Sequence, residues 1–243
     1  MAQADPKPLS HQVALVTGGS RGIGKAIAEK LASLGAAVSI CARDAAALQF
    51  AAASLRVLTD RVHAQVADVT NPEDISSLVQ ATEEKLGPIT LLVNNAGTGN
   101  PGFGAVQEKS ESDWDQVVDT NLKSVFLVSR AVAPLMIQRR RGDIINISSL
   151  AGKNTFAGGG IYCASKWGLQ GLSGCMAEDL RAFGIRVSVI CPGSVFTEFS
   201  GRGAKDPAKV LTAEDVAHAA AMVALQGPQS FISEVHLRPV TKP

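Results

Sequence analysis

Short runs of apolar residues alternate along this chain with longer segments in which apolar positions recur at helical spacing. The short runs are apolar throughout instead of alternating with polar residues. This is typical of strands in a parallel sheet that is covered on both faces. We therefore expect seven strands, at Val13–Thr17, Ala37–Ala42, Val62–Val66, Thr90–Asn94, Asp143–Ser148, Arg186–Cys191 and Glu234–Leu237.

The helical segments between these strands carry matching boundary residues. Asn71 and Thr212 stand where N-caps are expected, and glycines such as Gly142 follow several of the segments. The predicted helices are Gly22–Leu34, Asp44–Leu58, Pro72–Leu86, Ser112–Arg139, Ile161–Phe183 and Ala213–Ala224.

Strand–helix alternation at this spacing predicts right-handed βαβ crossovers. The expected fold class is α/β: a single doubly wound Rossmann domain with a seven-stranded parallel sheet flanked by helices on both faces. A length of 243 residues suits one such domain, and no repeat or linker interrupts it. We expect the domain to span residues 1–243, with the polar segment 1–10 flexible.

Charge and composition exclude several classes of partner. The net charge is +1, from 23 basic and 22 acidic residues, so a nucleic acid or an anionic membrane is not expected. No apolar run is long enough to cross a bilayer, and the N-terminus lacks the core of a signal peptide. The four cysteines and four histidines show no zinc spacing. We expect a cytoplasmic protein with reduced thiols and no metal.

A glycine-rich turn follows the first strand and precedes the first helix. Glycines allow a tight turn, and the helix N-terminus offers free N–H groups to a pyrophosphate. The spacing Gly18-x-x-x-Gly22-x-Gly24 differs from the common Gly-x-Gly-x-x-Gly fingerprint. The sequence Gly19–Lys25 also partly matches the P-loop motif, but Ala26 stands where that motif needs Ser or Thr. This weighs against a kinase or ATPase. A turn that serves packing alone remains an alternative.

Tyr162 and Lys166 lie four residues apart on a predicted helix and therefore share one of its faces. A nearby ammonium favours phenolate, so we expect it to lower the tyrosine pKa from about 10. Ser149, at the end of a strand, could hydrogen-bond a substrate oxygen. The set suggests carbonyl–alcohol chemistry; the alternative is a half-buried tyrosine beside a surface lysine.

Taken together over residues 10–200, these motifs resemble the short-chain dehydrogenase/reductase family. The regions Ile144–Ser149 and around Tyr162 are most similar to its 3-oxoacyl-(acyl-carrier-protein) reductase type. The matching residues are Thr17-Gly18-x-x-x-Gly22-x-Gly24, Asn94-Asn95-Ala96-Gly97, Asn121, Ser149, Tyr162-x-x-x-Lys166 and Pro192-Gly193.

The resemblance implies a role for four catalytic residues. Tyr162 is the general acid in reduction, Lys166 lowers its pKa and binds the nicotinamide ribose, and Ser149 holds the substrate oxygen. Asn121 would anchor a proton-relay water; the alternative is a buried side chain that satisfies helix backbone. The resemblance also implies a homodimer or homotetramer.

Cofactor selectivity is predicted from the end of the second strand. The acidic residue that selects NAD is absent at Ala42, while Arg43 follows and Arg21 lies in the glycine turn. Two guanidiniums favour a 2′-phosphate, so we predict NADP(H); NAD(H) is the alternative if Arg43 is only a solvated charge. The predicted cofactor contacts are Gly18, Ser20, Arg21, Gly22, Ile23, Gly24, Arg43, Asp68, Val69, Asn95, Ala96, Gly97, Tyr162, Lys166, Pro192, Gly193, Val195 and Thr197.

The expected activity is NADPH-dependent reduction of a small-molecule carbonyl, with a 3-oxoacyl thioester favoured. An NADP-dependent alcohol or 3-hydroxyacid dehydrogenase, or a non-catalytic NADP-binding sensor, are the alternatives. The chain departs from the reductase pattern at two places. The end after Gly227 lacks the usual Asp-Gly-Gly, and Ser194–Leu211 is short for a substrate lid. Both departures predict an open site and leave an acyl-carrier-protein partner undecided.

Overall fold

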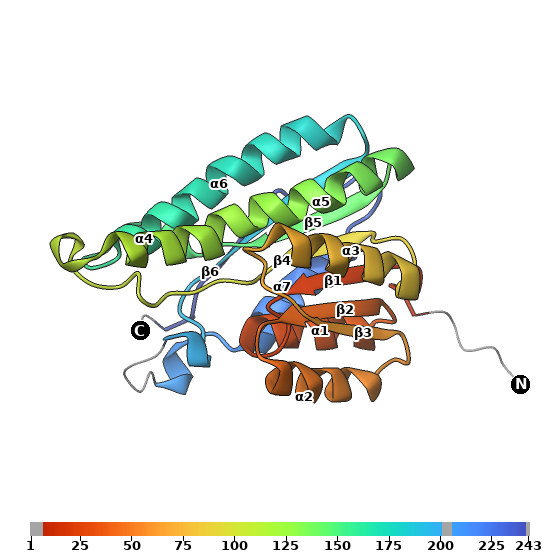
Figure 1. Ribbon diagram of the computed structural model, residues 1–243, viewed down its shortest axis with the longest axis horizontal. Coiled ribbons are helices and arrows are strands. Elements are labelled where there is room, and N and C mark those ends of the chain that lie inside the picture. Colours follow the sequence, from red (N-terminus) through yellow and green to blue (C-terminus); the bar gives the residue numbers. More distant parts are fainter. Residues whose placement is uncertain (1–6, 201–205, 242–243) are drawn as a thin grey trace, which may run out of the picture.

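The computed structural model describes residues 7–200 and 206–241 and contains a seven-stranded sheet with helices on both faces (Figure 1). The strand order is β3-β2-β1-β4-β5-β6-β7, and each neighbouring pair is parallel, which confirms the predicted fold. The strands are β1 (Val13–Thr17), β2 (Ala37–Ala42), β3 (Val62–Val66), β4 (Leu91–Asn94), β5 (Gly142–Ile147), β6 (Ile185–Pro192) and β7 (Glu234–Leu237).

The helices form two layers, with α1, α2 and α7 against one face of the sheet and α3, α5 and α6 against the other (Figure 1). Their bounds are α1 (Gly22–Ser33), α2 (Ala45–Arg56), α3 (Pro72–Leu86), α4 (Glu111–Val118), α5 (Ser124–Arg139), α6 (Gly160–Arg181) and α7 (Ala213–Ala224). Short helical turns are η1 (Val106–Glu108), η2 (Asp119–Lys123), η3 (Leu150–Gly152), η4 (Glu198–Ser200) and η5 (Pro207–Lys209).

Successive strand residues enter two different apolar cores. In β1, Ala14 and Val16 pack with α1 and α7, while Leu15 packs with α3, α5 and α6. Because side chains alternate between the faces of a strand, both faces of β1 must be apolar. This double burial explains why the central strands are continuously apolar in the sequence.

The helix predicted over Ser112–Arg139 is interrupted in the structure. A π-helical turn, η2, separates α4 from α5 while the backbone remains right-handed helical at the junctions. Such a turn inserts an extra residue without ending the helix, and its residues include no Gly or Pro that would signal it in the sequence. Arg140 ends α5 in the left-handed conformation. Gly142 was predicted to mark this helix end, but in the structure it is the first residue of β5.

Part of the N-terminal segment expected to be flexible is packed against the fold. Residues 1–6 lie outside the described residues. Leu9 is buried, and its N–H donates to the Leu34 carbonyl at 3.0 Å. The segment from Lys7 onward is therefore held beside the end of α1. Within the described ranges, no helix is both long and apolar enough to span a membrane.

Candidate active site

A cavity of about 1260 Å³ lies along the carboxyl ends of the strands, at the point where the order reverses between β1 and β4. Doubly wound folds bind ligands at such a switch point. The cavity is lined by each predicted catalytic and cofactor-binding residue except Asn121, whose neighbour Thr120 lines it. The structure thus brings together residues that are spread from Gly18 to Thr197 in the sequence.

The N-terminus of α1 lies at this cavity, and no described side chain occupies its backbone N–H groups. Among the described residues, no side chain caps α1 and no acidic residue occupies its first turn. By contrast, α3, α4 and α7 carry side-chain caps from Asn71, Ser110 and Thr212. The free N–H groups and positive dipole end of α1 suit a phosphate group.

Close packing explains the glycines in this turn. Gly18 and Gly22 have φ values of 65° and 52°, which disfavour residues with a side chain. A methyl group on Gly24 would lie 2.3 Å from the Asn95 side-chain nitrogen and 2.3 Å from the Gly18 carbonyl oxygen. The turn is therefore compressed against the loop that follows β4.

The ends of β1 and β4 are joined by a compact set of hydrogen bonds. The Thr17 hydroxyl accepts the N–H groups of Asn95 at 3.0 Å and Ala96 at 3.1 Å. The Asn95 amide donates to the carbonyls of Thr17 at 3.0 Å and Gly18 at 3.2 Å. Asn95 lines the cavity, but its amide is engaged in holding the glycine turn.

Arg43 and Asp68 form an ion pair at 3.7 Å on the cavity wall. Burial alone would raise the Asp68 pKa, but hydrogen bonds from Thr70 and the Arg43 charge together lower it. The Arg43 side chain is 71% exposed and is therefore free to reorient toward an anion. Arg21 lines the same cavity, so two guanidiniums lie on its wall, as the sequence predicts.

Tyr162 and Lys166 are both buried on α6, and burial dominates their ionisation. Lys166 Nζ donates to the Ile147 carbonyl at 3.0 Å and lies 6.0 Å from the centroid of the Tyr162 ring. Burial lowers the pKa of Lys166 to about 8. Burial raises the pKa of Tyr162 to about 12, although a hydrogen bond with Ser149 opposes this rise. The expected lowering of the tyrosine pKa is therefore wrong for this arrangement.

Ser148 and Ser149 have different partners. The Ser148 hydroxyl accepts from the Gln170 amide at 2.9 Å, away from the tyrosine. Ser149 accepts from the Ala151 N–H at 3.1 Å and hydrogen-bonds Tyr162. Of the two hydroxyls, that of Ser149 is the one that hydrogen-bonds the phenol, since neighbouring residues of an extended chain point in opposite directions.

Asn121 is buried in the π-helical turn and holds the loop after β4. Its carbonyl oxygen accepts the Thr98 N–H at 2.7 Å, and its amide donates to the Thr98 carbonyl at 2.8 Å and to Ser165 at 3.1 Å. The backbone groups that Asn121 satisfies belong to the loop after β4 and not to a helix, so they differ from the helix backbone named in the alternative. A methyl group on Gly97 would lie 3.2 Å from the Asn121 oxygen and 3.9 Å from Lys166 Nζ, so Asn121 borders the lysine.

An aromatic wall formed by Phe103, Phe156 and Phe199 was not predicted from the sequence. The Phe103 and Phe199 ring centroids lie 5.2 Å and 6.2 Å from that of Tyr162, and Phe156 lies 6.3 Å from Phe103. The three side chains come from separate segments, with Phe199 in η4, and share no spacing, so no local pattern identifies them. All three line the cavity and give it an apolar side next to the phenol.

The C-terminal tail also borders the cavity, although its sequence lacks the usual Asp-Gly-Gly. Arg238, Pro239 and Val240 line the cavity. The Gly193 N–H donates to the Leu237 carbonyl at 2.8 Å, and a methyl group on Gly193 would lie 3.1 Å from Pro239. The tail is therefore a wall of the site.

The short segment predicted to form the lid is anchored at both ends. Val195 and Leu211 form a parallel bridge, and the Phe196 N–H donates to the Leu211 carbonyl at 2.8 Å. Residues 201–205 of this segment lie outside the described residues. Val195 and Thr197, predicted as cofactor contacts, lie at the cavity next to Phe199.

The fold and the cavity define a doubly wound protein with its site at the switch point. Residues 12–208 match the model of the short chain dehydrogenase family, and the chain belongs to that family. It is 38% identical over 192 residues to 3-oxoacyl-(acyl-carrier-protein) reductase from Vibrio cholerae, covering 79% of this chain and 77% of that protein.

Two solved structures show the same architecture. A metagenomic short-chain oxidoreductase in complex with NADP is 43% identical, with a TM-score of 0.83, over 97% of this chain and 100% of that one. A variant of actinorhodin polyketide ketoreductase with NADPH is 32% identical, with a TM-score of 0.85, over 95% of each chain.

Gly24→Ala is expected to lower the free energy of unfolding by about 1–3 kcal/mol, because the methyl group overlaps Asn95 and the Gly18 carbonyl. Urea denaturation measures this change. Gly171→Ala on α6 is the matched control: nothing lies within 4 Å of its added methyl group, so stability should stay equal or rise by up to about 1 kcal/mol. Equal stability of both variants would contradict the compression of the turn.

Proposed function

We propose that this protein is an NADPH-dependent carbonyl reductase in which Tyr162 protonates the substrate oxygen. The observation that carries the proposal is the convergence of Tyr162, Ser149 and Lys166 on one cavity with the glycine turn. Relatives that bind NADP or NADPH, or that are named as 3-oxoacyl reductases, support it.

The residues along the cavity fit an extended dinucleotide. The uncapped start of α1 suits the pyrophosphate, and Gly18 and Gly24 admit it closely because neither carries a side chain. Arg21 and Arg43 would hold a 2′-phosphate, with Asp68 and Val69 beside the adenine. The far end would rest on Pro192, Gly193, Val195 and Thr197, next to Tyr162. When bound, NADPH supplies the hydride.

The raised tyrosine pKa suits reduction. With a pKa of about 12, the Tyr162 phenol keeps its proton at neutral pH and can give it to an oxygen that gains negative charge. Ser149 would donate a hydrogen bond to the same oxygen. Lys166, with a pKa of about 8, is mostly cationic at neutral pH and would stabilise the phenolate that remains. Asn121 would act by positioning the Gly97 loop beside Lys166.

The aromatic wall defines the substrate further. Phe103, Phe156 and Phe199 favour a carbonyl that carries an apolar group, and a 3-oxoacyl thioester remains the favoured class. The second candidate is NADP⁺-dependent oxidation of the corresponding alcohol. It requires the Tyr162 phenolate, which the raised pKa disfavours at neutral pH.

The protein would form a homodimer or a homotetramer and would function in a reducing, cytoplasmic environment. Trp114, Phe126 and Trp167 are exposed on α4, α5 and α6, where a second copy would cover them. Ala177 on α6 is buried in the core and packs inside the subunit. The free cysteines among the described residues suit a reducing compartment.

Tyr162→Phe is expected to lower kcat for ketone reduction by about 10²–10⁴-fold, because the general acid is lost. NADPH affinity should change far less than kcat, because Tyr162 is one of many cofactor contacts, and fluorescence titration measures it. Ser149→Ala should cost about 10²–10³-fold. Ser148→Ala is its matched control and should retain activity, since Ser148 contacts Gln170 and not the phenol. An active Tyr162→Phe enzyme would refute the mechanism.

The double variant Ala42→Asp, Arg43→Leu is expected to reduce the preference for NADPH over NADH by about 10- to 100-fold. It removes a charge-assisted contact to the 2′-phosphate and adds a repulsive carboxylate. The ratio of kcat/KM for the two cofactors measures the change. Arg56→Leu, at the end of α2 and outside the cavity, controls for the loss of one positive charge. If the double variant keeps the preference for NADPH, Arg43 does not select the cofactor.

For reduction, kcat/KM for NADPH is expected to decline above pH about 8, approaching tenfold per pH unit. Above that pH Lys166 loses its charge, whereas Tyr162, with a pKa of about 12, stays protonated. In Lys166→Arg the guanidinium keeps its charge, so the residual activity should lack this decline. A decline that persists at the same pH in Lys166→Arg would assign it to another group.

A further inference from the structure

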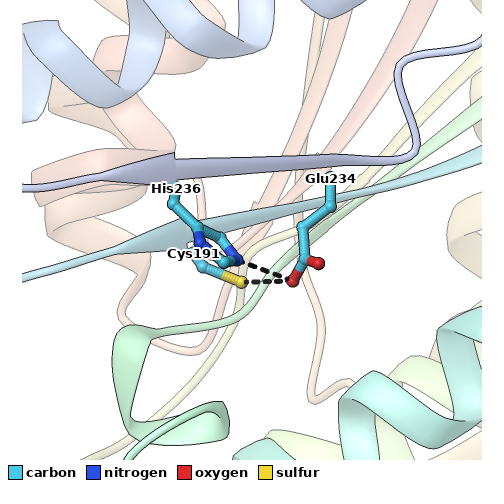
Figure 2. A group of neighbouring side chains, drawn as sticks. All are labelled: Cys191, Glu234 and His236. Atoms are coloured by element: carbon cyan, nitrogen blue, oxygen red, sulfur yellow. Dashed lines mark hydrogen bonds and ion pairs between the residues drawn. The ribbon is translucent and has the colours of Figure 1, made fainter.

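Three potential metal ligands meet outside the proposed catalytic cavity, at the edge of the sheet. In the register of β6 and β7, Cys191 lies directly opposite His236, and Glu234 precedes His236 by two positions. Side chains two positions apart point to the same face of a strand. Figure 2 shows the three side chains converging from the two adjacent strands.

Their separations are close to those in a metal coordination shell. The Cys191 Sγ lies 3.4 Å from Glu234 Oε1, the His236 Nε2 lies 3.0 Å from the same oxygen, and all three ligand atoms are within 4.8 Å of one another. Bonds of about 2.0–2.3 Å to a tetrahedral zinc ion place neighbouring ligand atoms roughly 3–4 Å apart. Small side-chain adjustments would therefore suffice to surround one ion.

Two other side chains currently contact this cluster. Lys153 Nζ lies 2.8 Å from Glu234 Oε1, and the Gln170 amide donates to Cys191 Sγ at 3.1 Å. The competing interpretation is a hydrogen-bond network centred on the Glu234 carboxylate. Lys153 is one-third exposed, so it can leave that oxygen or move to the second carboxylate oxygen when a cation arrives. Gln170 can keep its bond to Ser148.

We propose that Cys191, Glu234 and His236 bind one thiophilic divalent cation of the zinc class. Thiolate and imidazole ligands favour such ions over Mg²⁺ or Ca²⁺. The thiol gives up its proton to solvent as the sulfur–metal bond forms, and a water molecule completes four-coordination. This assignment is independent of the proposed reductase activity.

The location suggests what the ion does. It would link β7, the edge strand, to β6 and so hold the segment that continues into Arg238–Val240. That tail is a wall of the cavity, and the Leu237 carbonyl accepts the Gly193 N–H. The cation therefore fixes one wall of the site without touching the reacting atoms.

Cobalt(II) is the probe, because a cobalt–thiolate bond produces a near-ultraviolet charge-transfer band. Titration of the reduced, chelator-treated full-length protein should produce this band at one ion per chain, and Zn²⁺ should remove it by displacement. Cys191→Ser should lose the band. His236→Gln should weaken Co²⁺ binding by more than about tenfold, since even the loss of an outer-shell partner of a ligand costs about 10–100-fold in metal affinity.

Matched controls separate this site from general cation binding. Cys175→Ser removes an exposed cysteine and His218→Gln an exposed histidine on α7, and both variants should bind Co²⁺ like the wild type. Zn²⁺ should also raise the melting temperature of the wild type and of the controls, but not that of Cys191→Ser. The proposal is overturned if the wild type gives no band, if Cys191→Ser keeps it, or if the Zn²⁺ shift persists in Cys191→Ser. Circular dichroism confirms that each variant is folded.

Discussion

The hydrogen bonds between Thr17 and the Asn95–Ala96 backbone support the rest of the site. They join the ends of β1 and β4, where chain connections diverge to opposite faces of the sheet. The Asn95 amide returns two hydrogen bonds to the glycine turn, so the start of α1 is fixed relative to the loop after β4. A dinucleotide-sized cavity can be preorganised there because both of its central loops are anchored to the same two strands.

Burial has the largest effect on the pKa values of Tyr162 and Lys166, at the other end of the cavity. Removing a phenol and an ammonium from water favours the neutral form of each, and the hydrogen bond with Ser149 only partly offsets this effect on the tyrosine. The aromatic wall strengthens the burial of Tyr162, with Phe103 centred 5.2 Å away. A neutral phenol beside a cationic lysine is the pair that a proton donor needs in reduction. The same pair would have to lose a proton before it could oxidise an alcohol.

Much of this architecture can be predicted from the sequence because it depends on local patterns. Continuous apolar runs identify the central strands, and four of the seven, including β1 and β2, have the predicted bounds. Gly18, Gly22 and Gly24 signal the turn through backbone requirements that few other residues meet. Tyr162 and Lys166 lie on one face of α6, as their four-residue spacing predicts. The π-helical turn at Asn121 was not predicted, because its residues Asp119–Lys123 include no Gly or Pro that would signal an interruption.

The features missed from sequence are those created by contacts between distant segments. Phe103, Phe156 and Phe199 become a wall only after three loops meet around Tyr162. Cys191 and His236 have no ligand spacing along the chain, yet the parallel register of β6 and β7 places them opposite each other. The same register places Leu237 where its carbonyl accepts the Gly193 N–H. The residues after Leu237 therefore line the cavity, and an unusual C-terminal sequence becomes part of it. Sequence variation at the edge strand can therefore change this wall of the cavity without changing Tyr162, Ser149 or Lys166.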